Sequence, residues 1–232
     1  MSALALPADG NDPLALLGRA FDAQRHGAPP HVEHVLRWHD GSEATVKVAR
    51  WIADPTPEEL ALLDRVRGPV LDVGCGPGRH VSELQRRGIP ALGVDVLPEA
   101  VRFARARGAR ALQRSVFAPL PDTGRWRTAL LLDGNVGIGG DPAALLRRIH
   151  ALLGAGGIVL LEAEEHGIGL RCGTCRLETP AGSSTPFRWG RVGIDAVDTL
   201  AAACGFTVSD AWTVGGRWFA QLTADHRPTV VR

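Results

Sequence analysis

The chain has little of what defines several classes of protein. In 232 residues it contains no tyrosine, one lysine and 4 cysteines, and none of its apolar runs exceeds the length of a strand. The few, mostly scattered cysteines predict reduced thiols rather than a disulfide framework. The short apolar runs predict no membrane-spanning helix. Because 26 Lys and Arg balance 25 Asp and Glu, no basic field favours nucleic acid or a membrane surface.

What remains is the composition of one globular domain. The length is sufficient for a single substantial core, which is the usual organisation of α/β proteins of this size. Alanine, arginine and glycine dominate, a bias typical of a high-GC genome of actinobacterial type. We therefore expect a cytoplasmic protein that binds neither nucleic acid nor a membrane.

The strongest signal lies in the segment Val70–Arg79, which reads VLDVGCGPGR. It predicts a buried strand that ends in an acidic residue, a glycine-rich turn and the start of a helix. Gly74, Gly76 and Gly78 lack a Cβ, so a ligand can approach the main-chain N–H groups of the turn. Open α/β sheets bind small molecules at this place, where the carboxyl end of a strand faces a helix N-terminus.

A second acidic residue indicates a nucleoside site. Asp95 ends the apolar run that begins at Ala91, and it stands 21 positions after Gly74. A carboxylate at the tip of the second strand, about 20 residues past the glycines, can accept both ribose hydroxyls. The dinucleotide fingerprint G-x-G-x-x-G would require a glycine at the position of Arg79. Here the third glycine comes one residue earlier, at Gly78, which disfavours a dinucleotide.

The run Leu71–Gly78 resembles the first motif of the class I S-adenosylmethionine-dependent methyltransferases, and Asp95 matches the acid with which that family holds the ribose. The resemblance implies S-adenosyl-L-methionine as cofactor, S-adenosyl-L-homocysteine as its product, and no metal. It also implies that Ser115 receives the adenine amino group and that Val116 packs on the adenine ring. The residues expected at the cofactor are Asp72, Gly74, Cys75, Gly76, Gly78, Asp95, Val96, Ser115, Val116 and Asp133.

Strands and helices alternate from residue 56 onward. This order predicts an α/β fold with a doubly wound, Rossmann-like sheet that is mostly parallel. Gly215-Gly216 is a hairpin turn, so the last strand should be antiparallel, as in the family. Thr56 as N-cap and Pro57 begin a helix that runs to about Arg67. The other expected core helices are 79–87, 98–107, 142–153 and 195–204, and the expected strands are 70–73, 91–95, 109–113, 127–133, 157–162, 206–214 and 217–223.

Residues 1–55 precede this core as an N-terminal extension. Leu14–Gln24 has helical spacing, and the runs His31–Trp38 and Thr45–Trp51 flank Asp40-Gly41, a strong hairpin signal. We do not expect the hairpin in the main sheet. It either folds over the mouth of the cofactor site or packs on the edge of the sheet.

The core, residues 56–224, contains one long connection at 163–190, and a tail follows at 225–232. Connections of this type usually have about 2–6 residues, so the long one predicts an acceptor lid. Its arginines either form a basic pocket for a carboxylate or phosphate, or are surface charge. Cys172 and Cys175 lack a second ligand pair for zinc and lie in the wrong place for a redox motif, so a turn in a small hairpin is expected. The residues expected at the acceptor are His26, Arg171, Arg188 and Trp189.

Methyl transfer depends mainly on the alignment of two reactants and the exclusion of water. A general base is required only if the nucleophile still carries its proton, and His166 is the candidate unless it is merely solvated. Asp133, which ends the fourth strand, and Asn135 are the other catalytic candidates, because the family places residues there between cofactor and acceptor. The alternative is that they only cap loops. Asp133–Val136 departs from the Asn/Asp-Pro-Pro-aromatic signature of the amino-directed nucleic-acid and protein enzymes of this family, which disfavours those substrates.

The sequence therefore predicts a methyltransferase that acts on an oxygen or nitrogen nucleophile of a small-molecule acceptor. Two alternatives stay open. The first is a nicotinamide-dependent oxidoreductase that uses the same glycine loop. The second is a non-catalytic module that binds S-adenosylmethionine without turnover.

Overall fold

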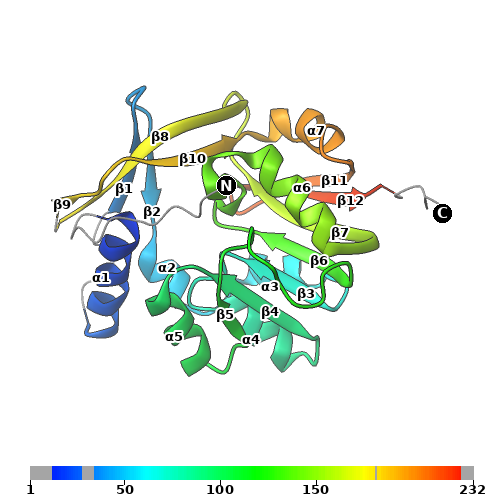
Figure 1. Ribbon diagram of the computed structural model, residues 1–232, viewed down its shortest axis with the longest axis horizontal. Coiled ribbons are helices and arrows are strands. Elements are labelled where there is room, and N and C mark those ends of the chain that lie inside the picture. The colour runs from blue at the N-terminus through cyan, green and yellow to red at the C-terminus, as the bar shows by residue number, and fades with distance from the viewer. Residues whose placement is uncertain (1–11, 28–33, 181, 226–232) are drawn as a thin grey trace.

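A computed structural model of the chain describes residues 12–27, 34–180 and 182–225, without the side chain of Arg25. The expectations for His31 and for nearly all of the C-terminal tail therefore lie outside the described residues. The described chain forms two β-sheets with helices packed around them (Figure 1). No helix in these ranges is long and apolar enough to cross a membrane.

The core elements follow the predicted order, with small changes at their ends. The helices are α1 (Pro13–Arg25), α2 (Val48–Ile52), α3 (Pro57–Leu63), α4 (Arg79–Arg86), α5 (Pro98–Ala106), α6 (Pro142–Leu152) and α7 (Ile194–Ala202), with a 3₁₀ segment η1 (Asn135–Gly140). The strands are β1 (His34–Trp38), β2 (Glu43–Val46), β3 (Val70–Val73), β4 (Ala91–Asp95), β5 (Ala111–Gln113), β6 (Trp126–Leu131), β7 (Leu153–Ala163), β8 (Leu170–Thr179), β9 (Gly182–Ser183), β10 (Phe187–Val192), β11 (Phe206–Val214) and β12 (Arg217–Ala224).

The main sheet has seven strands in the order β11-β12-β7-β6-β3-β4-β5. Strands β3 to β7 pair in parallel, whereas β12 runs antiparallel to both β7 and β11. The predicted sheet, mostly parallel with an antiparallel last strand, is therefore confirmed. Because parallel strands end at the same edge of a sheet, the segments that follow β3, β4, β6 and β7 meet there.

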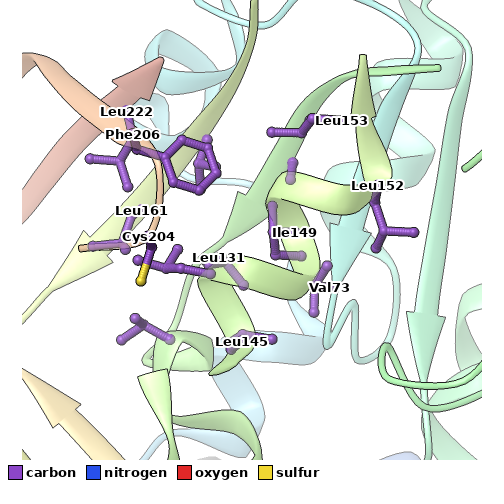
Figure 2. Packing of buried hydrophobic residues seen from close by; sticks show 14 of the residues in the cluster. Val73, Leu131, Leu145, Ile149, Leu152, Leu153, Leu161, Cys204, Phe206 and Leu222 are labelled. Atoms are coloured by element: carbon purple, nitrogen blue, oxygen red, sulfur yellow. The ribbon is translucent and has the colours of Figure 1, made fainter. Parts of the chain in front are cut away.

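Helices cover both faces of this sheet. Figure 2 shows Leu145 and Ile149 of α6 among Val73, Leu131 and Leu161 of the strands, in a cluster that also includes residues of α7. Helices α3, α4 and α5 pack on the opposite face through a separate cluster. Successive side chains of a strand point to opposite faces, so neighbouring residues of β3, β6 and β7 divide between the two clusters. The sheet is therefore doubly wound, as predicted.

The start of α3 was predicted correctly, but its end was not. Thr56 accepts a hydrogen bond from the main-chain N–H of Glu59, and the Glu59 carboxylate accepts one from the N–H of Thr56. This capping box satisfies two of the N–H groups that a helix start leaves without a partner. The helix ends at Leu63, one turn before the predicted Arg67.

The second sheet unites the N-terminal hairpin with the predicted lid. Its strand order is β10-β8-β1-β2, with β9 paired to β8, and it lies beside the main sheet (Figure 1). The hairpin is thus outside the main sheet, as expected, but its second strand ends at Val46 and Val48–Ile52 is helical. The expectation for Cys172 and Cys175 was wrong: both lie within β8, where Cys172 is exposed and Cys175 is buried, so they are not at a turn.

Candidate active site

The glycine loop between β3 and α4 opens onto a cavity of about 660 Å³ at the carboxyl edge of the main sheet. Gly76 lines this cavity with a φ of 52°, and a Cβ placed there would meet no atom within 4 Å. The main chain at Gly76 is therefore open to a ligand. Gly78 has a different role, because a Cβ there would lie 2.7 Å from the Cβ of Ala104. Gly78 does not line the cavity but lets α4 start close to α5.

Asn135 holds this loop in place. Its Nδ2 donates to the main-chain oxygens of Val73 and Gly74, both at 2.9 Å. Asn135 and Gly74 also line the cavity. Of the two predicted roles, loop capping is therefore present, since the amide nitrogen of Asn135 binds η1 to the loop.

Asp95 faces the cavity from the end of β4. Its Oδ2 accepts a hydrogen bond of 2.9 Å from the N–H of Gly76, and its Oδ1 accepts one of 2.9 Å from the N–H of Leu97. Burial raises the pKa of Asp95 above its ordinary value. An ionised carboxylate has about four acceptor sites, so the two main-chain bonds leave Asp95 with capacity for two more donors. Val96, which is 44% exposed, lines the cavity beside it.

A second wall of the cavity is formed by the segment after β5. Ser115, Val116 and Phe117 all line it, and Phe117 is 44% exposed. Arg148 of α6 holds this segment by donating from Nε to the main-chain oxygen of Val116 at 2.8 Å. Cys75 lines the cavity as well, but burial raises the pKa of its thiol well above the ordinary value. Cys75 is therefore not a thiolate nucleophile.

Charged side chains from four elements meet at the floor of the cavity. Asp133, at a φ of 55°, accepts from Arg79 at 2.6 Å and from Arg217 at 3.5 Å. Its main-chain N–H donates to Glu162 at 2.7 Å, and Arg217 donates to the same carboxylate at 2.6 Å. Arg79, Asp133 and Glu162 line the cavity. Such charge-assisted bonds hold the segment after β6 in a fixed position relative to α4, β7 and β12.

Glu59 of α3 completes this network from below. Its side chain is 1% exposed and accepts from Arg50, Arg79 and Arg217 at 2.9–3.0 Å. Burial alone would raise the pKa of Glu59, but the nearby cations His80 and Arg79 lower it far below the ordinary value. The carboxylate is therefore ionised, and it orients the two arginines that hold Asp133.

Asp72 and His80 form a second buried pair beneath the loop. The His80 ring lies 3.8 Å from Asp72 on one side and 3.8 Å from Glu59 on the other. Burial and the neighbouring Arg79 lower the pKa of His80, but the two carboxylates raise it more, and the net direction is upward. Asp72 does not line the cavity. It was expected at the cofactor, but its side chain lies beneath the loop and faces His80.

The far end of the cavity differs sharply from its floor. It is formed by residues of α1, β1, β2, α2 and β8, which we call the cap chamber. Its described members are Pro13, Leu14, Leu17, Phe21, Leu36, Trp38, Ala44, Thr45, Val46, Trp51 and Leu177. None of them carries a charge.

An ion pair between buried Arg191 and half-buried Glu164 links the cap chamber to the core. Arg191 of β10 is 7% exposed and donates to the carboxylate of Glu164, at the end of β7, from both Nε and Nη2. Its Nη1 donates to Ser42 in the hairpin at 3.1 Å, and its guanidinium lies 4.8 Å from the ring of Trp38. Glu164 and Trp38 both line the cavity. One arginine thus joins β10, β7 and the hairpin.

Besides Gly78 and Asp72, three predicted site residues lie outside the cavity. His166 is exposed after β7 and packs edge-on against Trp218, with ring centroids 5.0 Å apart. Arg171 is exposed on β8 and lies 3.5 Å from Asp40. His26 is exposed at the end of α1, and none of the three lines the cavity. The basic pocket expected from the lid therefore does not form around Arg171.

The other two predicted acceptor residues do reach the cavity. Arg188 and Trp189, both on β10, line it. Three charged residues without a predicted role, Arg79, Glu162 and Glu164, line it too. Arg79 follows the loop directly and was interpreted only as a missing glycine. Glu162 ends the predicted fifth strand, which was a usable signal, because such strand ends lie at the ligand-binding edge.

Two solved structures have a similar fold. One is a SAM-dependent methyltransferase from Bacteroides fragilis in complex with S-adenosyl-L-homocysteine, 24% identical, with a TM-score of 0.75 over 95% of this chain and 98% of that chain. The other is the 1,6-didemethyltoxoflavin-N1-methyltransferase of Burkholderia thailandensis, 22% identical, with a TM-score of 0.52 over 68% of this chain and 71% of that chain. These similarities confirm the predicted fold class.

Sequence comparison gives the family. A 2-heptyl-1-hydroxyquinolin-4(1H)-one methyltransferase from Mycobacteroides abscessus is 40% identical over 60 residues, which span 25% of this chain and 26% of that relative. A family described as methyltransferase domain matches residues 47–166, just over half of the chain. This match covers the glycine loop, Asp95 and the floor of the cavity, and it confirms the family predicted from the glycine loop. The chain belongs to the methyltransferase domain family.

Proposed function

We propose that this protein transfers a methyl group from S-adenosyl-L-methionine to an oxygen or nitrogen atom of a small molecule. One observation carries the proposal: the Asp95 carboxylate and the open main chain at Gly76 face the same cavity and are joined by a hydrogen bond. A carboxylate with free acceptor capacity beside bare main chain, at the carboxyl end of two parallel strands, suits a nucleoside with two hydroxyls.

The residues that line the cavity offer a partner for each part of this cofactor. Asp95 would hold the ribose, and Val96 and Val116 would pack on the adenine. The hydroxyl of Ser115 would accept a hydrogen bond from the adenine amino group. The loop at Gly74–Gly76 and the charged floor would hold the amino-acid end, since ammonium and carboxylate groups need partners of both signs. The other floor residues in that role are Arg79 and Asp133.

The cofactor supplies a methyl carbon activated by a sulfonium. The chain's part is to align the acceptor and exclude water, and alignment alone supplies about 7–11 kcal/mol. Both sheets and α1 contribute to the lining, so the reacting atoms are enclosed by the core on one side and the cap on the other. Among the described lining residues, Glu162 and Glu164 are the carboxylates at the end of β7, and arginines already bind both. We therefore propose no dedicated general base.

The extension at 1–55 and the lid at 163–190 are proposed to act as one cap, because their described strands share a sheet. We further propose that the protein acts in the cytoplasm, with a small molecule rather than a nucleic acid or a membrane as its partner. All four cysteines are free thiols, which suits a reducing compartment.

Calorimetric titration of the purified chain with S-adenosylmethionine, S-adenosylhomocysteine and NADH tests the cofactor assignment. Both adenosyl ligands should bind and NADH should not. Tight NADH binding without a response to either adenosyl ligand would favour the oxidoreductase alternative. Binding without turnover on any acceptor would leave the non-catalytic module.

Asp95→Ala tests the residue that carries the proposal. Each hydrogen bond to a charged group contributes about 1.5–3 kcal/mol, so the dissociation constant for S-adenosylhomocysteine should rise about 10- to 100-fold. Asp198→Ala, an exposed aspartate on α7 that does not line the cavity, is the matched control and should bind as the wild type does. An unchanged dissociation constant in Asp95→Ala would remove the ribose assignment.

A further inference from the structure

The cavity separates charge from apolar surface along its length. Its charged lining residues all come from the main-sheet elements, the loops that follow them or β10, and Asp95, Asp133 and Glu162 are among them. In the cap chamber, ten of the eleven described residues are apolar and the other is Thr45. A cofactor held by Asp95 and the charged floor leaves the cap chamber for the second reactant.

The aromatic residues of the chain are concentrated around this cavity. The whole sequence has only 6 Phe and 6 Trp, and half of these twelve line the one cavity. Phe21, Trp38 and Trp51 belong to the cap chamber, and Phe187 and Trp189 adjoin it on β10. Aromatic side chains present flat apolar faces on which a planar ring stacks in an offset or edge-on arrangement.

The elements that form the cap chamber are held together by strand pairing and side-chain hydrogen bonds. Strand β1 pairs with β8 from Val35 to Trp38, so the hairpin is part of a continuous sheet. Arg191 joins this sheet to β7 through Glu164 and to the hairpin through Ser42. A charged group on a ligand held among the described residues of the cap chamber would lose its water without gaining a charged partner from them, which is strongly unfavourable.

We propose that the acceptor is an uncharged molecule with a planar ring and a hydrocarbon substituent. The apolar part lies in the cap chamber, and the nucleophilic oxygen or nitrogen points toward the charged end near Glu164. This inference rests on the proposed function and adds the substrate class to it. The same surface disfavours sugars, amino acids and acyl carboxylates as acceptors, because each would place hydroxyl or charged groups against Leu17, Leu36 and Leu177.

Three probes of one ring system test the substrate class. They are 1-hydroxyquinolin-4-ones that carry at position 2 a methyl group, a heptyl chain, or a chain of the same length that ends in a carboxylate. The purified full chain is titrated with each in the presence of S-adenosylhomocysteine, and methylated product is measured by mass spectrometry with S-adenosylmethionine. Each buried methylene contributes about fourfold in affinity, so the heptyl compound should bind at least tenfold more tightly than the methyl compound. The terminal carboxylate should abolish that gain.

A pair of variants on α1 ties the effect to the cap chamber. Leu17→Glu places a charge inside it and should weaken heptyl binding at least tenfold, while S-adenosylhomocysteine binds as before. Ala23→Glu introduces the same charge on the exposed face of the same helix and should change neither. If Leu17→Glu does not fold, Leu36→Gln on β1 replaces it. Retained cofactor binding shows that a variant is folded.

The outcomes separate this inference from the proposed function. Loss of all adenosyl-ligand binding in the wild type refutes the proposed function. Three results refute the substrate class alone, provided that the cofactor binds normally. They are equal binding of the heptyl and methyl compounds, tightest binding of the carboxylate compound, and no binding of any compound. Heptyl binding that is insensitive to Leu17→Glu would also overturn it.

Discussion

Replacement of Glu59 by glutamine should greatly lower the stability of the whole domain. The Glu59 carboxylate is 1% exposed and accepts hydrogen bonds from Arg50, Arg79 and Arg217. Glutamine keeps the shape of the side chain but removes the charge and turns one acceptor into a donor. The substitution therefore leaves guanidinium groups, one of them only 3% exposed, without their shared counter-ion.

The expected magnitude follows from the burial of this network. Removing one partner of a buried ion pair typically costs about 3–5 kcal/mol, because the other charge stays desolvated. Native domains are stable by about 5–15 kcal/mol, so this cost is a large share of the total. For a domain of this size it corresponds to a decrease of about 6–20 °C in Tm. Asp133 moderates the loss, since it still accepts from Arg79 and Arg217.

Urea unfolding followed by circular dichroism measures the effect, with Glu58→Gln as the control. Glu58 is the neighbouring residue in the same first turn of α3 and forms no buried ion pair, so its replacement should leave the free energy of unfolding essentially unchanged. A loss below about 1 kcal/mol in Glu59→Gln would refute the argument that buried charge governs this network.

The same unfolding measurement at acid pH gives a second test. The pKa of Glu59 is lowered by folding, so its contribution is present above the ordinary value of about 4.3 and is lost as the pH falls below it. The difference between wild type and Glu59→Gln should therefore shrink in acid.

Two further predictions concern the glycine loop and the side chains beneath it. The pKa of His80 is raised by folding, so its stabilising charge is present below about pH 6.5 and is lost as the pH rises through the folded pKa. Urea unfolding between pH 6 and 9 should show this loss of stability in the wild type and not in His80→Gln. Parallel pH profiles of the two proteins would contradict the prediction. Gly78→Ala should lower the free energy of unfolding by about 2–5 kcal/mol, because its φ of 76° is strained for alanine and its Cβ would lie 2.7 Å from that of Ala104. Gly108→Ala is the control, because Gly108 has a similar φ of 87° and no atom within 4 Å of an added Cβ, so it measures the backbone strain alone. Equal losses of the free energy of unfolding in both variants would show that the contact with Ala104 contributes nothing.

The sequence was sufficient to predict the core because its signals there are local. The strand, acid and glycines of Val70–Gly78 are contiguous, and Thr56 with Glu59 marks a helix start within four residues. Asp95 is fixed relative to Gly76 by the parallel pairing of two adjacent strands, which the βαβ order already implies. Ser115 and Val116, whose roles the family resemblance implies, line the same cavity.

A hairpin over the site and a lid were predicted separately, but their union in one sheet could not be, because that pairing is non-local. Strand β1 binds β8 across some 140 residues, with Val35 opposite Glu178, and no local pattern encodes such a partner. Once this pairing is known, the reason why some predicted acceptor residues miss the cavity is simple. Leu177 and Arg171 are six positions apart and so lie on the same face of β8, but Leu177 lines the cavity, whereas Arg171 lies at the exposed start of the strand. The lid arginines therefore differ in position, since Arg188 lines the cavity and Arg171 does not, while apolar residues of a hairpin that precedes the core line the cap chamber. The part of the chain proposed to select the acceptor is thus separated in sequence from the part proposed to bind the cofactor. The two meet at the Arg191–Glu164 ion pair, where α1 packs on α5, and where Arg50 donates to Glu59.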